Sequence, residues 1–331
     1  MQPAGKRVLS GIQPSGTLHL GNYFGAIQQH IELQTTHDCF FFIANYHTLT
    51  TLQDAKRLRQ LTFDVAVDYL ALGLDPNRAL IFRQTDVPEV CELAWILSTV
   101  TGMGLLERAH SYKDKVARGI HASMGLFSYP ILMAADILIY GSDLVPVGRD
   151  QVQHIEMTQD MAQSFNAAFG TTLLKRPEAR LNASPVVPGV DGQKMSKSYG
   201  NTIDIFGDAK DMKKRIMSIK TDSLGVEEPK DPDKCNVFAL LKLLATPAET
   251  AEWAERYRKG GVGYGEAKKR LHELYEAFFG AKRDARAGWA ARTGEVEDIL
   301  TTCGRKARAV AIELMAKIRD AAGLQTSRRD G

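Results

Sequence analysis

Short apolar runs alternate with longer amphipathic runs over the first two hundred residues of the chain. The apolar runs are strand-length, and they predict buried strands over residues 7–10, 38–45, 79–82 and 143–147. Between them, apolar positions recur at helical spacing, which predicts helices from about Gly21 and over residues 53–72, 88–100, 128–140 and 150–165. This alternation is typical of an α/β fold with a Rossmann-like parallel sheet, built from βαβ units.

The pattern changes after residue 205, where one amphipathic helix follows another with little strand signal. Helices are predicted over residues 207–218, 235–246, 248–259, 264–279, 281–291 and 304–322. In the last helix Ala307, Val310, Ala311, Leu314 and Ile318 recur on one face, so this helix is expected to pack back on the body. We therefore predict an α/β domain over 1–205, an all-α domain over 206–303, and a C-terminal helix and tail over 304–331.

Formal charge divides the chain at the same place. The net charge is −2 over residues 1–205 and +5 over residues 206–331, within a total of +3. A basic helical part is compatible with a polyanionic partner such as a nucleic acid, although a solvated helical surface carries similar charge.

The cysteines and the hydropathy indicate a cytoplasmic protein. Cys39, Cys91, Cys235 and Cys303 are far apart and form no Cys-x-x-Cys pair, which favours free thiols over a disulfide or zinc framework. The N-terminus has no apolar signal-peptide run. The most apolar stretch, residues 126–140, is too short to span a membrane.

A glycine-containing loop, Gly11-Ile-Gln-Pro-Ser-Gly-Thr-Leu-His-Leu-Gly-Asn22, follows the first predicted strand. It lies at the carboxyl edge of a parallel sheet, where such sheets bind ligands. Gly21 lets a phosphate approach the start of a helix, and His19 and Asn22 add neutral donors one turn apart. The segment predicts a polyphosphate site, with an ordinary strand–helix turn carrying an incidental histidine as the alternative.

A second candidate is Lys194-Met195-Ser196-Lys197-Ser198, in a stretch without helical or strand pattern that also contains Gly189, Gly192 and Gly200. Two lysines and two serines in such a loop can close on a triphosphate and stabilise the charge of a departing pyrophosphate. A generic basic loop is the alternative for this segment taken alone.

A third candidate is the apolar run from Tyr129 to Tyr140, in which Tyr129, Met133, Asp136 and Tyr140 share one helical face. A carboxylate within an apolar helix must find a partner. That partner is either a ligand or a donor elsewhere in the fold, and these residues alone leave both open.

The two motifs together resemble the class I aminoacyl-tRNA synthetases, whose signatures are a His-x-Gly-His type element and a Lys-Met-Ser-Lys-Ser loop. The loop is matched letter for letter, and Asn22 replaces the final histidine, as in the tryptophan and tyrosine subgroup and particularly its tryptophan branch. The run YPILMAADILIYGSDLVPVGRDQ is similar to that of the bacterial tryptophan enzymes. The resemblance extends over about residues 7–324.

For the amino acid, the resemblance implies that Asp136 accepts the indole N–H and that Met133 packs on the ring. Tyr129 and Gln151 match positions that hold the ammonium group, and Leu9 and His47 match pocket-lining positions. His47 is otherwise an ordinary core histidine.

For the nucleotide, the resemblance implies a set of ATP-binding positions: Gln13, Pro14, Ser15, Gly21, Asn22, Gly148, Arg149, Asp150, Val187, Lys194, Met195, Ser196, Lys197 and Ser198. Asp150 would accept from ribose hydroxyls, with a simple helix N-cap as a compatible alternative. Catalytic roles fall to His19, Asn22, Lys194 and Lys197, and to Lys113 and Lys115, which otherwise are solvated surface lysines. The segment 187–193 differs from the more common version that contains Met-Ser-Leu.

The implied reaction is activation of L-tryptophan by ATP and transfer to the 3′ end of tRNA(Trp). Mg²⁺ is expected on the ATP phosphates, with no protein metal site and no zinc. Some relatives carry an iron–sulfur cluster on four C-terminal cysteines, and none is expected here because only Cys235 and Cys303 lie in that part. The resemblance also implies a homodimer. A tyrosyl-tRNA synthetase, another adenylyltransferase and a catalytically silent RNA-binding paralogue are the alternatives.

Overall fold

The computed structural model describes residues 5–109, 123–181 and 186–324. The chain folds into two compact units. The sheet unit comprises Met1–Ser15, His30–Asn182 and Arg292–Gly331, and the helical unit comprises Gly16–Gln29 and Ala183–Ala291.

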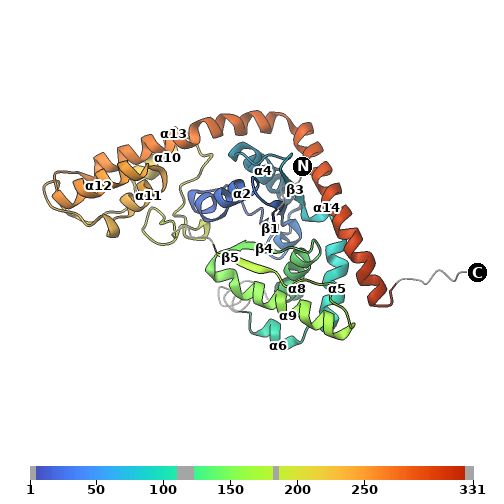
Figure 1. Cartoon of the computed structure of the whole chain (residues 1–331). Coiled ribbons are helices and arrows are strands. Elements are labelled where there is room, and N and C mark those ends of the chain that lie inside the picture. The colour runs from blue at the N-terminus through green and yellow to red at the C-terminus, as the bar shows by residue number, and fades with distance from the viewer. Residues whose placement is uncertain (1–4, 110–122, 182–185, 325–331) are drawn as a thin grey trace, which may run out of the picture. The chain divides into compact units, whose positions relative to one another are not determined.

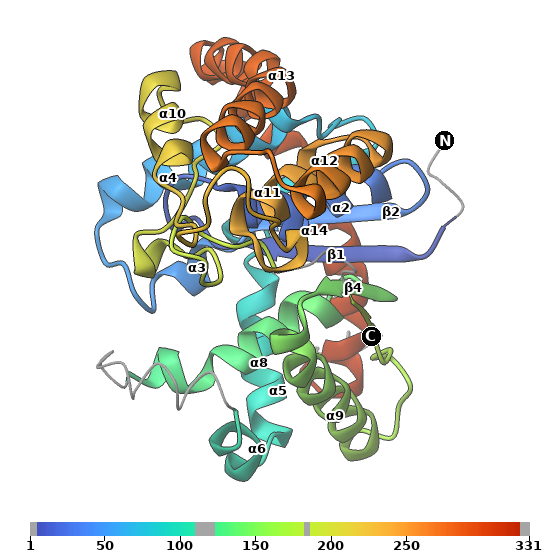
Figure 2. The same ribbon diagram turned by 90° about the vertical axis from the view of Figure 1, so that its left-hand side faces the viewer.

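The sheet unit contains a five-stranded parallel sheet in the order β3-β2-β1-β4-β5 (Figures 1 and 2). Its strands are β1 (Arg7–Ile12), β2 (Asp38–Ile43), β3 (Ala79–Arg83), β4 (Leu144–Val147) and β5 (Glu178–Leu181). In the central strand, Val8 pairs with Cys39 on one side and Leu144 on the other. The strand order reverses between β1 and β4, so the crevice at their carboxyl ends is where this kind of sheet binds ligands. The predicted Rossmann-like α/β fold is confirmed.

Helices pack against this sheet and against one another. They are α3 (Asn45–Thr48), α4 (Ala55–Leu72), η2 (Gln84–Asp86), α5 (Glu89–Val100), α6 (Met103–Glu107), α8 (Met124–Leu138), η3 (Arg149–Gln151), α9 (Val152–Ala168) and α14 (Thr293–Ala321). Helix α8 packs against α5 and α9, and α14 packs against β3 and α5 (Figure 1). The C-terminal helix is therefore part of the sheet unit.

The core of the sheet unit is aromatic and aliphatic. The side chains of Phe40, Phe82 and Tyr140 are almost completely buried, with ring centroids 5.3 Å apart for Phe40 and Tyr140 and 5.8 Å for Phe82 and Tyr140. Strand β2 is buried along five of its six residues, as expected for a strand covered on both faces. Tyr140 belongs to this core and does not share the pocket-facing side of α8, contrary to the helical-face prediction.

The helical unit is built from short turns and helices of different lengths. Its elements are α1 (Leu20–Asn22), the π-helix η1 (Tyr23–Ile27), η4 (Lys197–Tyr199), α10 (Ala209–Met217), η5 (Pro232–Lys234), α11 (Asn236–Leu244), α12 (Pro247–Lys259) and α13 (Tyr264–Ala291), while α2 (Gln28–Leu33) continues into the sheet unit. Helix α13 runs alongside α10 and α11 (Figure 1). The Tyr23 ring packs edge-on against Phe278 and Phe279 of α13, at centroid distances of 5.6 and 5.3 Å.

Four elements differ from the sequence prediction. Residues 264–279 and 281–291 form one helix, because Gly280 costs a helix only about 1 kcal/mol and nothing forces a break there. Helix α14 begins at Thr293 and not at 304. Helix α8 begins at Met124 and not at 128, so it contains Pro130 in its interior. Strand β5 was not predicted, because Glu-Ala-Arg-Leu is a largely exposed edge strand without an apolar run.

Among the residues with a described structure, no helix is long and apolar enough to cross a membrane.

Candidate functional site

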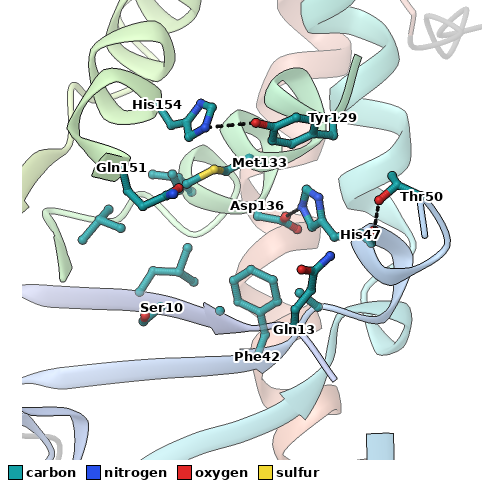
Figure 3. A pocket seen from close by; sticks show the side chains of 15 residues that line it. Ser10, Gln13, Phe42, His47, Thr50, Tyr129, Met133, Asp136, Gln151 and His154 are labelled. Carbon is teal, nitrogen blue, oxygen red and sulfur yellow. Dashed lines mark hydrogen bonds and ion pairs between the residues drawn. The ribbon is translucent and has the colours of Figure 1, made fainter. Parts of the chain in front are cut away.

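A pocket of about 360 Å³ opens in the sheet unit at the carboxyl ends of β1 and β4 (Figure 3). Figure 3 shows Tyr129, Met133 and Asp136 projecting from α8 toward the hollow, across from Phe42 of β2. All six residues predicted to bind the amino acid line this one pocket: Leu9, His47, Tyr129, Met133, Asp136 and Gln151. Apolar side chains of Phe42, Ile137 and Val145 complete much of its wall.

The Asp136 carboxylate is the charged group of this pocket, and its residue is only 1% exposed. Nε2 of Gln84 donates to both carboxylate oxygens, at 2.9 Å to Oδ1 and 2.8 Å to Oδ2. Nε2 of His47 lies 2.9 Å from Oδ2. Burial raises the pKa of Asp136 above its ordinary value, whereas the hydrogen bonds from His47 and Gln84 lower it in part. The carboxylate therefore has partners in the fold and also faces the pocket.

Gln84 was not predicted from the sequence. It occupies the first position of η2, directly after β3, and does not line the pocket itself. The signal that points to it is its place directly after a strand, at the carboxyl edge of the parallel sheet. His154 was also missed, and its Nε2 lies 3.0 Å from the hydroxyl oxygen of Tyr129.

A second cluster lies in the helical unit around His19, which precedes α1 as its N-cap. The His19 backbone N–H donates to Oδ1 of Asn22 at 3.1 Å, so Asn22 closes the start of the helix. The His19 residue is 6% exposed, and its Nδ1 has no hydrogen-bond partner among the described residues. Burial, and next the positive charge of Lys197, lower the pKa of His19 to about 4, against an opposing effect of Asp204. The ring is therefore neutral at neutral pH.

The His19 segment and the lysine loop belong to the same unit, although they are distant in the sequence. The Leu20 N–H donates to the Ile203 carbonyl at 3.0 Å, and the Ile205 N–H donates to the Leu18 carbonyl at 2.9 Å. A Cβ atom on Gly21 would lie 2.9 Å from Nδ1 of His19, so this position requires glycine. The structure thus brings together the two motifs that the sequence pairs.

Asn201 organises the lysine loop, and sequence reasoning missed it. The Asn201 residue is 2% exposed, and its Oδ1 accepts from the Ser196 N–H at 2.8 Å. Its Nδ2 donates to the Lys194 carbonyl at 3.2 Å and to Oδ1 of Asp191 at 2.8 Å. Met195 is buried and its N–H donates to the carbonyl of Val187. The side chains of this loop therefore project from a fixed backbone.

The predicted nucleotide-binding residues are divided between the two units. Gln13, Pro14, Ser15, Gly148 and Arg149 belong to the sheet unit, and Gln13 lines the pocket. Gly21, Asn22, Val187, Lys194, Met195, Ser196, Lys197 and Ser198 belong to the helical unit. Lys113, Lys115 and the side chain of Asp150 lie outside the described part of the chain.

Residues 4–280 match the family described as tRNA synthetases class I (W and Y). The chain is 50% identical over 320 residues to the tryptophan–tRNA ligase of Fusobacterium nucleatum, covering 96% of this chain and 98% of that protein. It is 51% identical over 319 residues to the tryptophan–tRNA ligase of Rhodopirellula baltica, covering 96% of this chain and all of that protein.

A solved structure with the same fold is the tryptophanyl-tRNA synthetase of Campylobacter jejuni complexed with ADP and tryptophan. It superposes with a TM-score of 0.90 at 50% sequence identity, covering 96% of this chain and all of that chain.

Proposed function

Because the chain belongs to the class I tRNA synthetases of the W and Y family, we propose that it joins L-tryptophan to tRNA(Trp) with ATP as the energy source. It is an aminoacyl-tRNA synthetase, similar over nearly its full length to tryptophan–tRNA ligases. The observation that carries the choice of amino acid is the buried Asp136 carboxylate, which faces a pocket with largely apolar walls.

Asp136 is suited to accept the indole N–H of tryptophan. A carboxylate has about four lone-pair positions. Gln84 and His47 make three contacts with it, which leaves room for one more donor at Oδ1. Phenylalanine would leave this charge desolvated without its donor, and tyrosine, with a single ring, would fill less of the pocket than the two fused rings of indole.

The other pocket residues are assigned by the same proposal. Met133 packs on the indole ring, and Leu9 and His47 form part of its wall. Tyr129 and Gln151 hold the ammonium group, which leaves the carboxylate of the amino acid directed toward the nucleotide. His154 holds the Tyr129 hydroxyl in place, at 3.0 Å.

In the first step an oxygen of the tryptophan carboxylate attacks the α-phosphorus of ATP. A new P–O bond forms to the carboxylate, the bond from the α-phosphorus to the bridging oxygen breaks, and pyrophosphate leaves with the bonding electrons. In the second step the 2′-hydroxyl of the terminal adenosine of tRNA attacks the acyl carbon, loses its proton, and AMP leaves. No protein nucleophile is required, so catalysis rests on positioning and charge stabilisation.

His19 and Asn22 are proposed as neutral donors to the phosphates, and Lys194 and Lys197 as cations that stabilise the departing pyrophosphate. A neutral His19 fits this role, because burial and Lys197 lower its pKa to about 4. Lys113 and Lys115 are proposed to reach the phosphates as well. Gln13, Pro14, Ser15, Gly148, Arg149 and Asp150 complete the proposed nucleotide contacts from the sheet unit.

Mg²⁺ is assigned to the ATP phosphates and given no protein ligand. The described residues contain no cluster of three or more His, Cys, Asp or Glu side chains able to hold a metal ion. Mg²⁺ commonly keeps several waters and binds through substrate phosphates, so the reaction does not require such a cluster.

The macromolecular partners are proposed from charge and exposed apolar surface. The basic part of the chain after residue 205 suits the anionic backbone of tRNA, whose anticodon we expect helices α10–α13 to contact. In the sheet unit Trp95, Met103 and Met124 are 73, 61 and 74% exposed, on the packed helices α5, α6 and α8. Large exposed apolar side chains mark interaction surfaces, and we propose that a second copy of this chain covers them in a cytoplasmic homodimer.

ATP–pyrophosphate exchange, measured with each of the twenty amino acids separately, tests this function. Tryptophan should be the strong responder. A strong response to tyrosine would identify a tyrosine enzyme of the same family, and the absence of exchange with every amino acid would identify a catalytically silent paralogue.

A further inference from the structure

Gln84 does not line the amino-acid pocket, but it contacts Asp136, the carboxylate that lines the pocket among the described residues. We propose that Gln84 is a specificity-determining positioning residue, which orients the Asp136 carboxylate and keeps it an acceptor for a ring N–H. The proposal rests on the proposed function. It adds a residue that does not touch the substrate but determines how Asp136 recognises the ring N–H of the substrate.

Hydrogen bonds at both the oxygen and the nitrogen of the Gln84 amide fix its orientation. Its Oε1 accepts the backbone N–H of Tyr46 at 3.0 Å, so its Nε2 must face Asp136, where it lies 2.9 and 2.8 Å from the two oxygens. A flipped amide would place Oε1 against the carboxylate and the amide NH₂ against another N–H. Both contacts would be repulsive, so the amide has one stable orientation.

The turn that carries Gln84 is held on both sides. Asn45 of α3 accepts the Thr85 N–H at 3.2 Å and donates to the Thr85 hydroxyl at 2.9 Å. The Arg83 N–H donates to Oδ2 of Asp86 at 3.0 Å, and the Arg83 guanidinium pairs with Glu297 of α14 at 2.6 Å. Gln84 is thus a fixed donor, and its residue is 1% exposed.

A fixed donor matters here because Asp136 is buried. Burial raises the pKa of Asp136, and the hydrogen bonds from His47 and Gln84 oppose that rise. A protonated Asp136 would lose one acceptor position to its own proton and would present an O–H donor. Among the described residues, the charge of this carboxylate also raises in part the pKa values of Tyr140 and Cys91.

The principal test is Gln84→Met, which keeps the side-chain length and removes the donor. The KM for tryptophan in ATP–pyrophosphate exchange should rise about ten- to a hundredfold, as for the loss of a hydrogen bond to a charged group, while the KM for ATP stays unchanged. The preference for tryptophan over β-(3-benzothienyl)alanine, in which sulfur replaces the ring N–H, should fall by about the same factor.

A second variant, Gln84→Glu, gives a signature that a structural role would not produce. At low pH the introduced carboxyl group and Asp136 share a proton, so the new side chain donates to Asp136 much as the amide does, and the KM for tryptophan should approach that of the wild type. At high pH both carboxylates are charged and the KM should rise. In Gln84→Met the KM for tryptophan should instead rise as the pH falls, because Asp136 protonates more readily without the Gln84 donor.

Gln34 supplies the matched control. It is also a buried glutamine, 5% exposed, and its amide bridges the Gly73 carbonyl and the Asp75 N–H without lining the pocket. Gln34→Met should lower the melting temperature and leave the KM for tryptophan and its pH trend unchanged.

The outcomes separate this proposal from the proposed function. If the wild type shows no tryptophan-dependent exchange, the function itself is wrong. If the wild type responds to tryptophan, but the Gln84 variants match it in the KM for tryptophan, in analogue preference and in pH trend, the role of Gln84 is overturned. Equal pH trends in Gln84→Met and Gln84→Glu would overturn it as well.

Discussion

A Cβ atom placed on Gly304 would lie 2.7 Å from Cβ of Asp86, so helix α14 crosses the end of the 84–86 turn without room for a side chain. Gly304 therefore serves the packing of α14 against the turn and does not mark the start of a helix. The turn carries Gln84, which contacts Asp136. The C-terminal helix thus supports the amino-acid pocket from behind.

Gly304→Ala should lower the free energy of unfolding by about 1–3 kcal/mol, because the added methyl group forces the turn and the helix apart. It should also raise the KM for tryptophan through the displaced Gln84. Denaturant unfolding and exchange kinetics check both effects. Gly294→Ala, on the same helix with no atom within 4 Å of the added Cβ, is the control and should leave the KM unchanged. Unaltered tryptophan kinetics in Gly304→Ala would contradict the coupling.

Lys197→Met should raise the pKa of His19 above about 4, because the Lys197 charge is the second cause of its lowering, after burial. An NMR titration of the His19 ring measures this shift directly. Lys194→Met is the control, since Lys194 is not among the groups that shift His19.

The lowered pKa of His19 also predicts how the stability of the folded protein changes with pH. A histidine with a lowered pKa is protonated more readily in the unfolded chain, so stability is lost as the pH falls from about 6.5 toward 4. Lys197→Met should reduce this loss of stability at low pH, as measured by thermal unfolding at several pH values. If Lys197→Met loses as much stability at low pH as the wild type, or more, and the His19 titration is not shifted, then Lys197 does not act on this ring.

Lys197→Ala should slow adenylate formation about a hundred- to a thousandfold, as expected when a group that stabilises developing charge is removed. The Kd for tryptophan should stay nearly constant, because the pocket lies in the other unit. Single-turnover adenylate formation and calorimetric titration with tryptophan measure the two quantities. Lys210→Ala, an exposed lysine at the start of α10, should change neither. Equal losses in rate and in tryptophan binding would rule out the proposed role.

Much of the fold follows from local patterns. Strands β1 to β4 are apolar runs, and burial between layers of helices requires such runs. Strand β5 has no such pattern, because an edge strand with exposed side chains is held by pairing with β4, which is a tertiary property. The sequence prediction divides α13 at Gly280, because glycine lowers helix propensity. The helix is continuous because that cost is small and nothing forces a break there.

The candidate site was predictable where its residues share one element or one motif. Tyr129, Met133 and Asp136 lie on one face of α8, and helical spacing alone places them together. Gln84 and Asn201 act through contacts with residues that are not their helical neighbours. Gln84 reaches Asp136 from another strand end, and Asn201 holds its loop through backbone groups, so neither contact leaves a pattern in the sequence.

The most direct test of the central claim is aminoacylation of two tRNA transcripts, tRNA(Trp) and tRNA(Tyr), each with labelled tryptophan and with labelled tyrosine. The account predicts that tryptophan accumulates on tRNA(Trp), and that the other three combinations stay near background. Charging of tRNA(Tyr) with tyrosine, or no charging of tRNA(Trp) by an enzyme that forms tryptophanyl-adenylate, would contradict it.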